Sequence, residues 1–462
     1  MSAADFDVRA FGGVGDGRTM NTAPFRAAVA AAHASWAATG AAASVVVAEG
    51  VYVTGCVALL SGVHLRVDAG ATLLASNDAS QFPAGGGAGS WGVVFAEGAR
   101  DVGVFGGGTL DGDWSAYVGA WDARNVEYVP RGWDGACAGN STSDCRPMLA
   151  KFVGCSDVTV ADVALVGSPF WTLHLLNCST VAVRNVTQRG DERFPNNDGI
   201  DIDSSQHVLV SDSTFDTADD GVCIKSTPGC LDTFNVTVRN VTVRSRSSAV
   251  KIGSATPVDI HDLLFEDVRV HDSNGGLSIQ ARDGGTVSNV AFRNILVNGT
   301  RQWPGIANAS GAEFGGWWGS GENIWISTVP RTETSPRGLV RNISYENIVG
   351  VGQNANFISG RAPGNAVSGV TLRNVTLTID RWPWWNFSHP DHDYRPTSAL
   401  PLDLQPAPTD ALFVEAVEGL VLEGVTLRFA RANAQPYWTR VCVNASAAGF
   451  PVREEGVTCD TF

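Results

Sequence analysis

The sequence has no apolar run long enough to span a bilayer, so we predict that it has no membrane partner. Basic residues are few: 32 Lys and Arg stand against 47 Asp and Glu, and the formal net charge is −15. This balance argues against a nucleic-acid partner, because phosphate backbones are held by basic surfaces. The sequence also lacks a Cys-x-x-Cys pair and a His cluster, so we expect no metal site. We expect a soluble protein that would bind a polyanion only through local basic residues.

Cysteines and glycosylation sequons, by contrast, are frequent. The chain has nine Cys and eleven Asn-x-Ser/Thr sequons, which is typical of a glycosylated protein in an oxidising compartment, so we predict a secreted, extracellular protein. Three pairs are close enough in sequence to close small disulfide loops, namely Cys137 with Cys145, Cys223 with Cys230, and Cys442 with Cys459. No apolar signal segment follows Met1. We therefore interpret the sequence as a mature form with an added start.

Short alternating segments recur with a constant period. Their last apolar positions include Val183, Val210, Val238, Phe265 and Phe292, so the steps are 27, 28, 27 and 27 residues. No helical segment separates these strands, and a solenoid is the way to stack parallel strands without crossover helices. The period therefore predicts an all-β fold, a single-stranded parallel β-helix with one coil per repeat.

A solenoid needs a cover at each end, because its end coils expose strand edges. We expect one domain over residues 1–462, with an N-terminal cap over about 1–45, coils over about 46–430 and a C-terminal cap over about 431–462. The Ala-rich residues 22–39 predict a capping helix with Thr22 as its N-cap. Trp-rich loop insertions interrupt the coils at 300–335 and 380–398, where the rings either stack on sugars or hold the loops down.

Two short segments concentrate carboxylates on one face. Residues 197–203, Asn-Asp-Gly-Ile-Asp-Ile-Asp, and residues 218–225, Ala-Asp-Asp-Gly-Val-Cys-Ile-Lys, alternate apolar with charged side chains, as half-buried strands do. If the segments lie on neighbouring coils, Asp198, Asp219 and Asp220 converge, because parallel strands are about 4.8 Å apart. Clustered carboxylates raise one another's pKa and are suited to binding a cation or to acid–base chemistry. The alternative is a solvated acidic face.

Basic and amide side chains are expected around these carboxylates. The same stacking places Lys251 and Ser278 in register with Cys223, and it brings Lys225, Lys251, Arg282 and His271 close to the carboxylates. We predict the following substrate-binding set: Asn197, Asp201, Lys225, Lys251, Gln280 and Arg282. The alternative is a charge ladder that only neutralises the acids.

Several motifs together point to a known family. They are Phe11–Gly17 with Asn21-Thr22, the segments 107–112 and 168–172, Arg146-Pro147, and above all Asn197-Asp198-Gly199 followed by Asp219-Asp220. The last two resemble the Asn-Thr-Asp and Asp-Asp motifs of glycoside hydrolase family 28, the polygalacturonases and their relatives, and the resemblance covers most of the chain. It implies that the β-helix is right-handed.

The resemblance also implies an inverting hydrolase that cleaves pectin-type polysaccharide without a cofactor. Asp219 would be the general acid, with its pKa raised by neighbouring carboxylates, while Asp198 and Asp220 would position and deprotonate the water. The expected partner is a polysaccharide or oligosaccharide, and the expected state is a monomer.

The sequence departs from the family at two motifs. Gly-His-Gly is replaced by residues 244–251, Arg-Ser-Arg-Ser-Ser-Ala-Val-Lys, and Arg-Ile-Lys by Ser278-Ile279-Gln280. Either Lys251 and Arg282 substitute for the missing cations, or the bound sugar is not galacturonate. Galacturonan and rhamnogalacturonan therefore both stay open as substrates.

Two other functions fit the same residues. A β-helix polysaccharide lyase would hold Ca²⁺ with carboxylates and would use Lys or Arg as its base; the candidate ligands are Asp198, Asp201, Asp203 and Asp220. A glycan-binding protein that lost its activity with the two motifs would bind without turnover.

Overall fold

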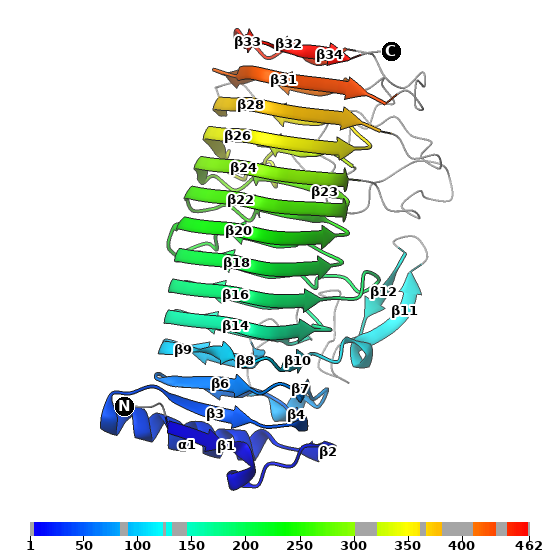
Figure 1. The fold of residues 1–462 in the computed structure, drawn as a ribbon. Helices are drawn as coiled ribbons and strands as arrows, with labels where there is room; N and C mark the ends of the chain where they lie inside the picture. Colours follow the sequence, from blue (N-terminus) through cyan, green and yellow to red (C-terminus); the bar gives the residue numbers. More distant parts are fainter. Residues whose placement is uncertain are drawn as a thin grey trace. The chain divides into compact units, whose positions relative to one another are not determined.

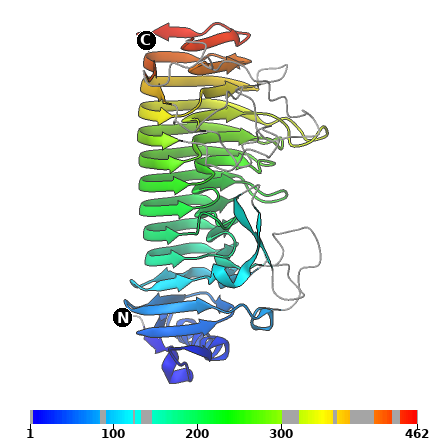
Figure 2. The same ribbon diagram turned by 90° about the vertical axis from the view of Figure 1, so that its right-hand side faces the viewer.

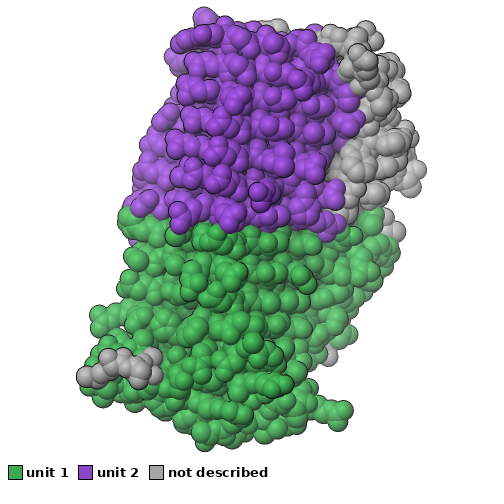
Figure 3. Space-filling model, in the orientation of Figure 1, with its two compact units in different colours: residues 1–219 green, residues 220–462 purple. Residues whose placement is uncertain are grey.

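The computed structural model describes residues 4–83, 91–122, 126–131, 146–300, 321–360, 366–380, 410–430 and 441–460. They form two compact units, residues 1–219 and 220–462 (Figure 3). The prediction of a right-handed parallel β-helix with an N-terminal capping helix is confirmed. Among the described residues, no helix is both long enough and apolar enough to cross a membrane.

The first unit stacks its coils through two kinds of parallel strand (Figure 1). In the long sheet the strands are β1 (Ala4–Asp7), β2 (Asp16–Met20), β3 (Ala43–Val47), β4 (Gly50–Thr54), β6 (Val63–Val67), β7 (Ala71–Ala75), β9 (Arg100–Phe105), β10 (Thr109–Asp111), β14 (Ser156–Val166), β16 (Ser179–Arg189) and β18 (Gln206–Thr217). In the short sheet they are β5 (Val57–Leu59), β8 (Gly92–Glu97), β13 (Met148–Val153), β15 (Leu173–Leu176) and β17 (Ile200–Asp203). Val158, Val181 and Val208 pair in register and are at most 3 % exposed, so the repeated valines form the core.

Smaller elements complete this unit. Helix α1 (Thr22–Thr39) has the predicted bounds and lies against β1 and β3, and its Phe25 and Val29 are buried. The prediction of Thr22 as its cap is wrong: the N-cap is Asn21, and the Thr22 hydroxyl accepts the N–H of Gly55 at 3.0 Å. The remaining elements are the antiparallel hairpin β11 (Val118–Asp122) and β12 (Glu127–Pro130) and the 3-10 helices η1 (Val8–Phe11), η2 (Ala79–Gln81) and η4 (Trp114–Tyr117).

The second unit repeats the two-sheet plan. In the long sheet its strands are β20 (Thr233–Ser245), β22 (Ile260–Ser273), β24 (Thr286–Thr300), β26 (Leu339–Gly352), β28 (Val367–Ile379), β30 (Val417–Glu418), β31 (Val421–Phe429), β33 (Arg453–Glu455) and β34 (Thr458–Asp460). In the short sheet they are β19 (Val222–Lys225), β21 (Ser248–Ser254), β23 (Gly275–Ala281), β25 (Ile324–Ser327), β27 (Asn356–Ser359), β29 (Leu412–Glu415) and β32 (Val443–Ala447). Trp325, expected on a loop, is on strand β25 and is 1 % exposed. The remaining tryptophans of the two predicted insertions, at 303, 317, 318, 382, 384 and 385, lie outside the described residues.

Long strands bend at asparagines stacked from coil to coil, and Figure 2 shows these bends along one edge. Asn289 and Asn294 on β24, and Asn342 and Asn347 on β26, have positive φ near 55°, which Asn tolerates better than most residues. Asn342 donates its amide to Asn289 at 2.8 Å, Asn347 to Asn294 at 3.0 Å, and Asn374 to Asn347 at 2.8 Å. The bends therefore form two hydrogen-bonded ladders.

These bends also account for part of the sequon density. The sequon residues Asn342 and Asn374 are ladder members, and Asn185 makes the same kind of bond to Asp162 at 2.9 Å. A bend favours Asn, and the strand that follows favours β-branched Thr, so Asn-x-Thr arises from the coil geometry itself. Glycosylation stays a prediction.

The three predicted cysteine pairs have three different outcomes. Cys442 and Cys459 form a disulfide, as expected, whereas Cys137 and Cys145 lie outside the described residues. The pairing of Cys223 with Cys230 is wrong, since both are thiols. Cys223 lies on β19 and is buried, and its thiol donates to the carbonyl of Gly253 at 3.2 Å.

Reduction of the Cys442–Cys459 disulfide is expected to lower the free energy of unfolding by about 3 kcal/mol, because it releases a loop with a sequence separation of 17. Urea unfolding with and without reductant measures the effect. The double variant Cys442→Ser/Cys459→Ser is the control. It lacks this disulfide, so any change in its unfolding free energy on adding reductant comes from other disulfides. Equal responses of the wild type and the variant would contradict the prediction.

Candidate active site

In the first unit, the predicted alternation on strand β17 is confirmed. Ile200 and Ile202 are fully buried in the core, while Asp201 and Asp203 occupy the opposite face. On the neighbouring strand β15, His174 pairs with Asp201 in register, and its Nε2 lies 3.4 Å from Oδ2 of Asp203. Both carboxylates are at most 3 % exposed, so the expectation of a half-buried strand is wrong and this face is buried as well.

The turn before β17 connects Asn197 with the segment that carries Asp219. The side-chain oxygen of Asn197 accepts the backbone N–H of Ala218 at 2.6 Å and that of Asp219 at 3.4 Å. Its Nδ2 donates to the carbonyl of Asp191 at 3.0 Å. Asn197 therefore holds the Asp219 backbone, and its predicted contact with substrate stays a prediction.

Asp219 and Asp198 are both buried, at 5 % and 2 % exposure. Oδ2 of Asp219 accepts a hydrogen bond from Nδ2 of Asn196 at 3.4 Å. Asn196 was not among the predicted site residues. Asn196 has a φ of 62°. The Asn-Asn pair before Asp198 could have indicated a left-handed turn at this position, because Asn is among the few residues that adopt a positive φ readily.

In the second unit, Asp220 is held by a buried ion pair. Lys251 Nζ lies 2.6 Å from Oδ2 of Asp220, and both side chains are 4 % exposed. The Ser247 hydroxyl donates to Oδ1 at 2.7 Å. Burial alone would raise the pKa of Asp220, but the charges of Lys251 and Lys225, with the hydrogen bonds from Lys251 and Ser247, bring the pKa below its usual value. Asp220 is therefore a carboxylate at neutral pH.

The predicted register of the short strands in this unit is confirmed. Cys223 on β19 pairs with Lys251 on β21, which pairs with Ser278 on β23. Lys225 is 8 % exposed and Gln280 is fully buried. Lys225 and Lys251 both act on the charge of Asp220, as the charge-ladder alternative requires.

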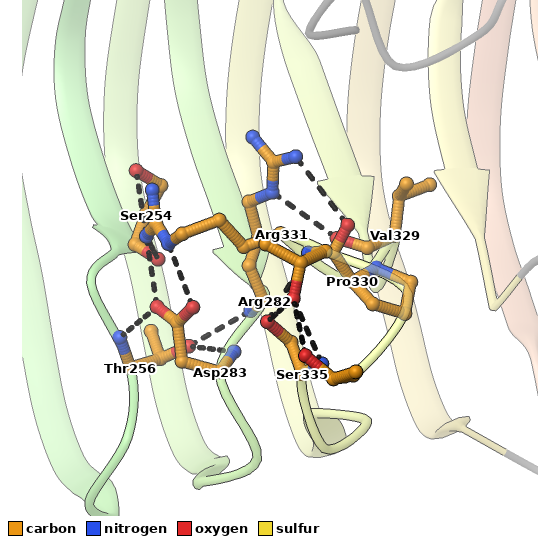
Figure 4. A network of polar contacts seen from close by, with 10 residues as sticks. Ser254, Thr256, Arg282, Asp283, Val329, Pro330, Arg331 and Ser335 are labelled. Carbon is orange, nitrogen blue, oxygen red and sulfur yellow. Dashed lines mark hydrogen bonds and ion pairs between the residues drawn. The ribbon is translucent and has the colours of Figure 1, made fainter. Parts of the chain in front are cut away.

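Arg282 follows β23 and is clamped by backbone carbonyls (Figure 4). Its Nε donates to the carbonyl of Val329 at 3.1 Å and its Nη2 to that of Pro330 at 3.5 Å, and the residue is 2 % exposed. Next to it, Asp283 binds Arg331 through both oxygens at 2.7 and 2.8 Å.

His271 was expected close to the carboxylates. It lies instead on β22, in the other sheet, with an exposed side chain.

Known proteins resemble the chain in both sequence and fold. Residues 39–308, more than half of the chain, match the model of Glycosyl hydrolases family 28. A probable polygalacturonase of Vitis vinifera is 25 % identical over 81 % of this chain and 75 % of its own length. A probable rhamnogalacturonase A of Aspergillus oryzae is 28 % identical over 54 % of this chain and 48 % of its own length. The crystal structure of an exopolygalacturonase from Thermotoga maritima has a TM-score of 0.69 at 19 % identity, covering 93 % of this chain and 92 % of its own.

Proposed function

Because the chain belongs to glycosyl hydrolases family 28 and is a glycoside hydrolase, we propose that it hydrolyses pectic polysaccharide with inversion at the anomeric carbon. Similar proteins named polygalacturonase and rhamnogalacturonase support a galacturonan or a rhamnogalacturonan as substrate. We further propose that it acts outside the cell, since pectic polysaccharide is a cell-wall polymer, and that it is a monomer.

The proposal is carried by the different surroundings of two consecutive carboxyl groups. Asp219 accepts a hydrogen bond from the neutral amide of Asn196, whereas Asp220 is an ion-pair partner of Lys251. Consecutive Cα atoms are about 3.8 Å apart, so the peptide bond itself keeps the two groups close. Neighbouring carboxyl groups in unlike environments can serve as acid and base in one reaction.

Each carboxyl group is assigned one role. Asp219 protonates the leaving glycosidic oxygen, while the ionised Asp220 and Asp198 orient a water molecule and take its proton. Inverting glycosidases keep acid and base about 6.5–9.5 Å apart so that this water fits between them and attacks the opposite face of the sugar. The pair Lys251–Asp220 keeps the base ionised.

A uronate substrate also needs a cation for its carboxylate. Lys225, Lys251 and Arg282 are the proposed carboxylate ligands, with Asn197, Asp201 and Gln280 as further contacts. Ser278 and Gln280 replace two cations of the family motif, and this replacement supports a sugar other than galacturonate at that position.

Release of reducing sugar from a panel of pectic polysaccharides, with and without EDTA, tests the proposal. We expect release that persists in EDTA, with a product that NMR shows to be inverted at its anomeric carbon. Release that EDTA abolishes, with the ultraviolet absorbance of unsaturated uronates, would establish a lyase instead. Binding without release from any polysaccharide would establish a glycan-binding protein.

A further inference from the structure

Arg146 is a fully buried cation whose guanidinium is held on three sides in the first unit. Its Nη1 donates to the carbonyls of Pro169 at 2.8 Å and Pro195 at 3.0 Å, and its Nη2 donates to Oδ1 of Asn196 at 2.9 Å. A guanidinium offers several donors in one rigid plane, which suits three acceptors at fixed positions. Arg146 therefore determines where the Asn196 side chain lies.

Aromatic rings and carboxylates enclose this cation. The guanidinium carbon lies 5.0 Å from the ring centre of Phe170 and 5.4 Å from that of Phe194. Burial lowers the pKa of Arg146 to about 9, against the opposing charges of Glu127, Asp198 and Asp219. Arg146 is thus charged at neutral pH. It interacts electrostatically with Asp198 and Asp219, the two carboxyl groups of the proposed mechanism that belong to this unit.

Contact with Arg146 fixes which end of the Asn196 amide points to Asp219. A guanidinium has donors only, so Asn196 must present Oδ1 to it and must turn Nδ2 the other way. Nδ2 then donates to Oδ2 of Asp219, which acts as an acceptor. A protonated carboxyl group has one O–H, so the proton of Asp219 is directed to Oδ1.

We propose that Arg146 and Asn196 are positioning residues for the general acid: Arg146 orients the Asn196 amide, which holds Oδ2 of Asp219 and leaves the proton on Oδ1, directed to the leaving oxygen. This inference rests on the proposed role of Asp219 as the acid. It predicts that neither residue acts on the sugar directly, and that each acts only on the efficiency of proton donation.

Substitutions at Asn196 separate the orientation from the fold. Asn196→Gly keeps a residue that accepts the positive φ, and it removes the amide. Asn196→Asp still accepts from Arg146 but cannot donate to Asp219. Arg146→Lys keeps a nitrogen donor on a long side chain but loses the planar fork. Arg193→Met is the control, because Arg193 is a half-exposed arginine that pairs with Asp191.

The readout compares two leaving groups on the sugar that the panel identifies: the polysaccharide itself and an aryl glycoside with an acidic phenol. An acidic phenol leaves without protonation, so only the polysaccharide needs a well-placed acid. In the Asn196 variants and Arg146→Lys, we expect kcat on the polysaccharide to fall roughly 10- to 100-fold, within the range of general acid catalysis. KM and turnover of the aryl glycoside should stay near the wild-type values.

Equal losses on both substrates would overturn the inference, because they would show a general effect on the structure of the site. Wild-type kcat on the polysaccharide in the Asn196 variants or in Arg146→Lys would overturn it as well. The Asp219→Asn variant distinguishes a failure of the proposed function from a failure of the positioning role alone. If that variant keeps full activity, the proposed function fails; if it is inactive while the other variants are not, only the positioning role fails.

Discussion

Replacing Asp219 with asparagine is expected to lower kcat on the polysaccharide by roughly 10²- to 10⁴-fold, which is the contribution of a positioned general acid. Asparagine keeps the size of the side chain and can still bond Asn196, but it carries no proton that it can donate. KM should change little, because the substitution removes an interaction made in the transition state. Steady-state kinetics on the polysaccharide measures both parameters.

Asp162→Asn is the matched control for this variant. Asp162 is a half-exposed carboxylate at a positive-φ bend of β14, a conformation that Asn also adopts readily. We expect wild-type kcat there. An Asp219→Asn enzyme with more than about a tenth of wild-type kcat would refute the acid role, given the size of that contribution.

Replacing Lys251 with methionine is expected to destabilise the second unit by about 3–5 kcal/mol, because it leaves the buried Asp220 carboxylate without its ion-pair partner. Urea unfolding at neutral pH measures the loss. Arg373→Met is the control: Arg373 pairs with Glu423 at 2.8 Å, but its side chain is 54 % exposed, and such surface pairs contribute little to stability. Similar losses in the two variants would contradict the prediction.

The same ion pair determines a pH dependence. The folded-state pKa of Asp220 is lowered, so its contribution to stability is present above the unfolded value of about 3.9 and is lost as pH falls through the folded value. The stability difference between wild type and Lys251→Met should therefore shrink as pH falls, because protonation of Asp220 removes the charge that Lys251 neutralises. The double variant Asp220→Asn/Lys251→Met removes both charges, and it should recover much of the loss at neutral pH.

The coil architecture could be predicted because its signals are local. Ile200 and Ile202 alternate with Asp201 and Asp203, so a strand with one apolar face follows from nearest neighbours alone. The period from Val183 to Phe292 then predicts the stacking, and the pairing of Cys223, Lys251 and Ser278 confirms the register inferred from it. Helix α1 was also evident from its Ala-rich composition.

Contacts that define the site depend on residues far apart in the chain. Asn196 and Arg146 are 50 residues apart, and no local pattern indicates that the guanidinium turns towards that amide. Lys251 binds Asp220 from 31 residues away, although Lys225 is much closer in sequence. The pairing of Cys223 with Cys230 failed for the same reason, because the strand turns Cys223 towards Gly253.

By itself, the sequence determined the repeating strands, their apolar faces and the two carboxylate motifs, since alternation and turn preferences act over a few residues. Only the tertiary structure decided which cation neutralises Asp220 and which amide meets Asp219. Coil stacking decides which side chains lie within reach of each carboxyl group. Burial then makes an unpaired charge strongly destabilising, so a buried carboxylate must be paired.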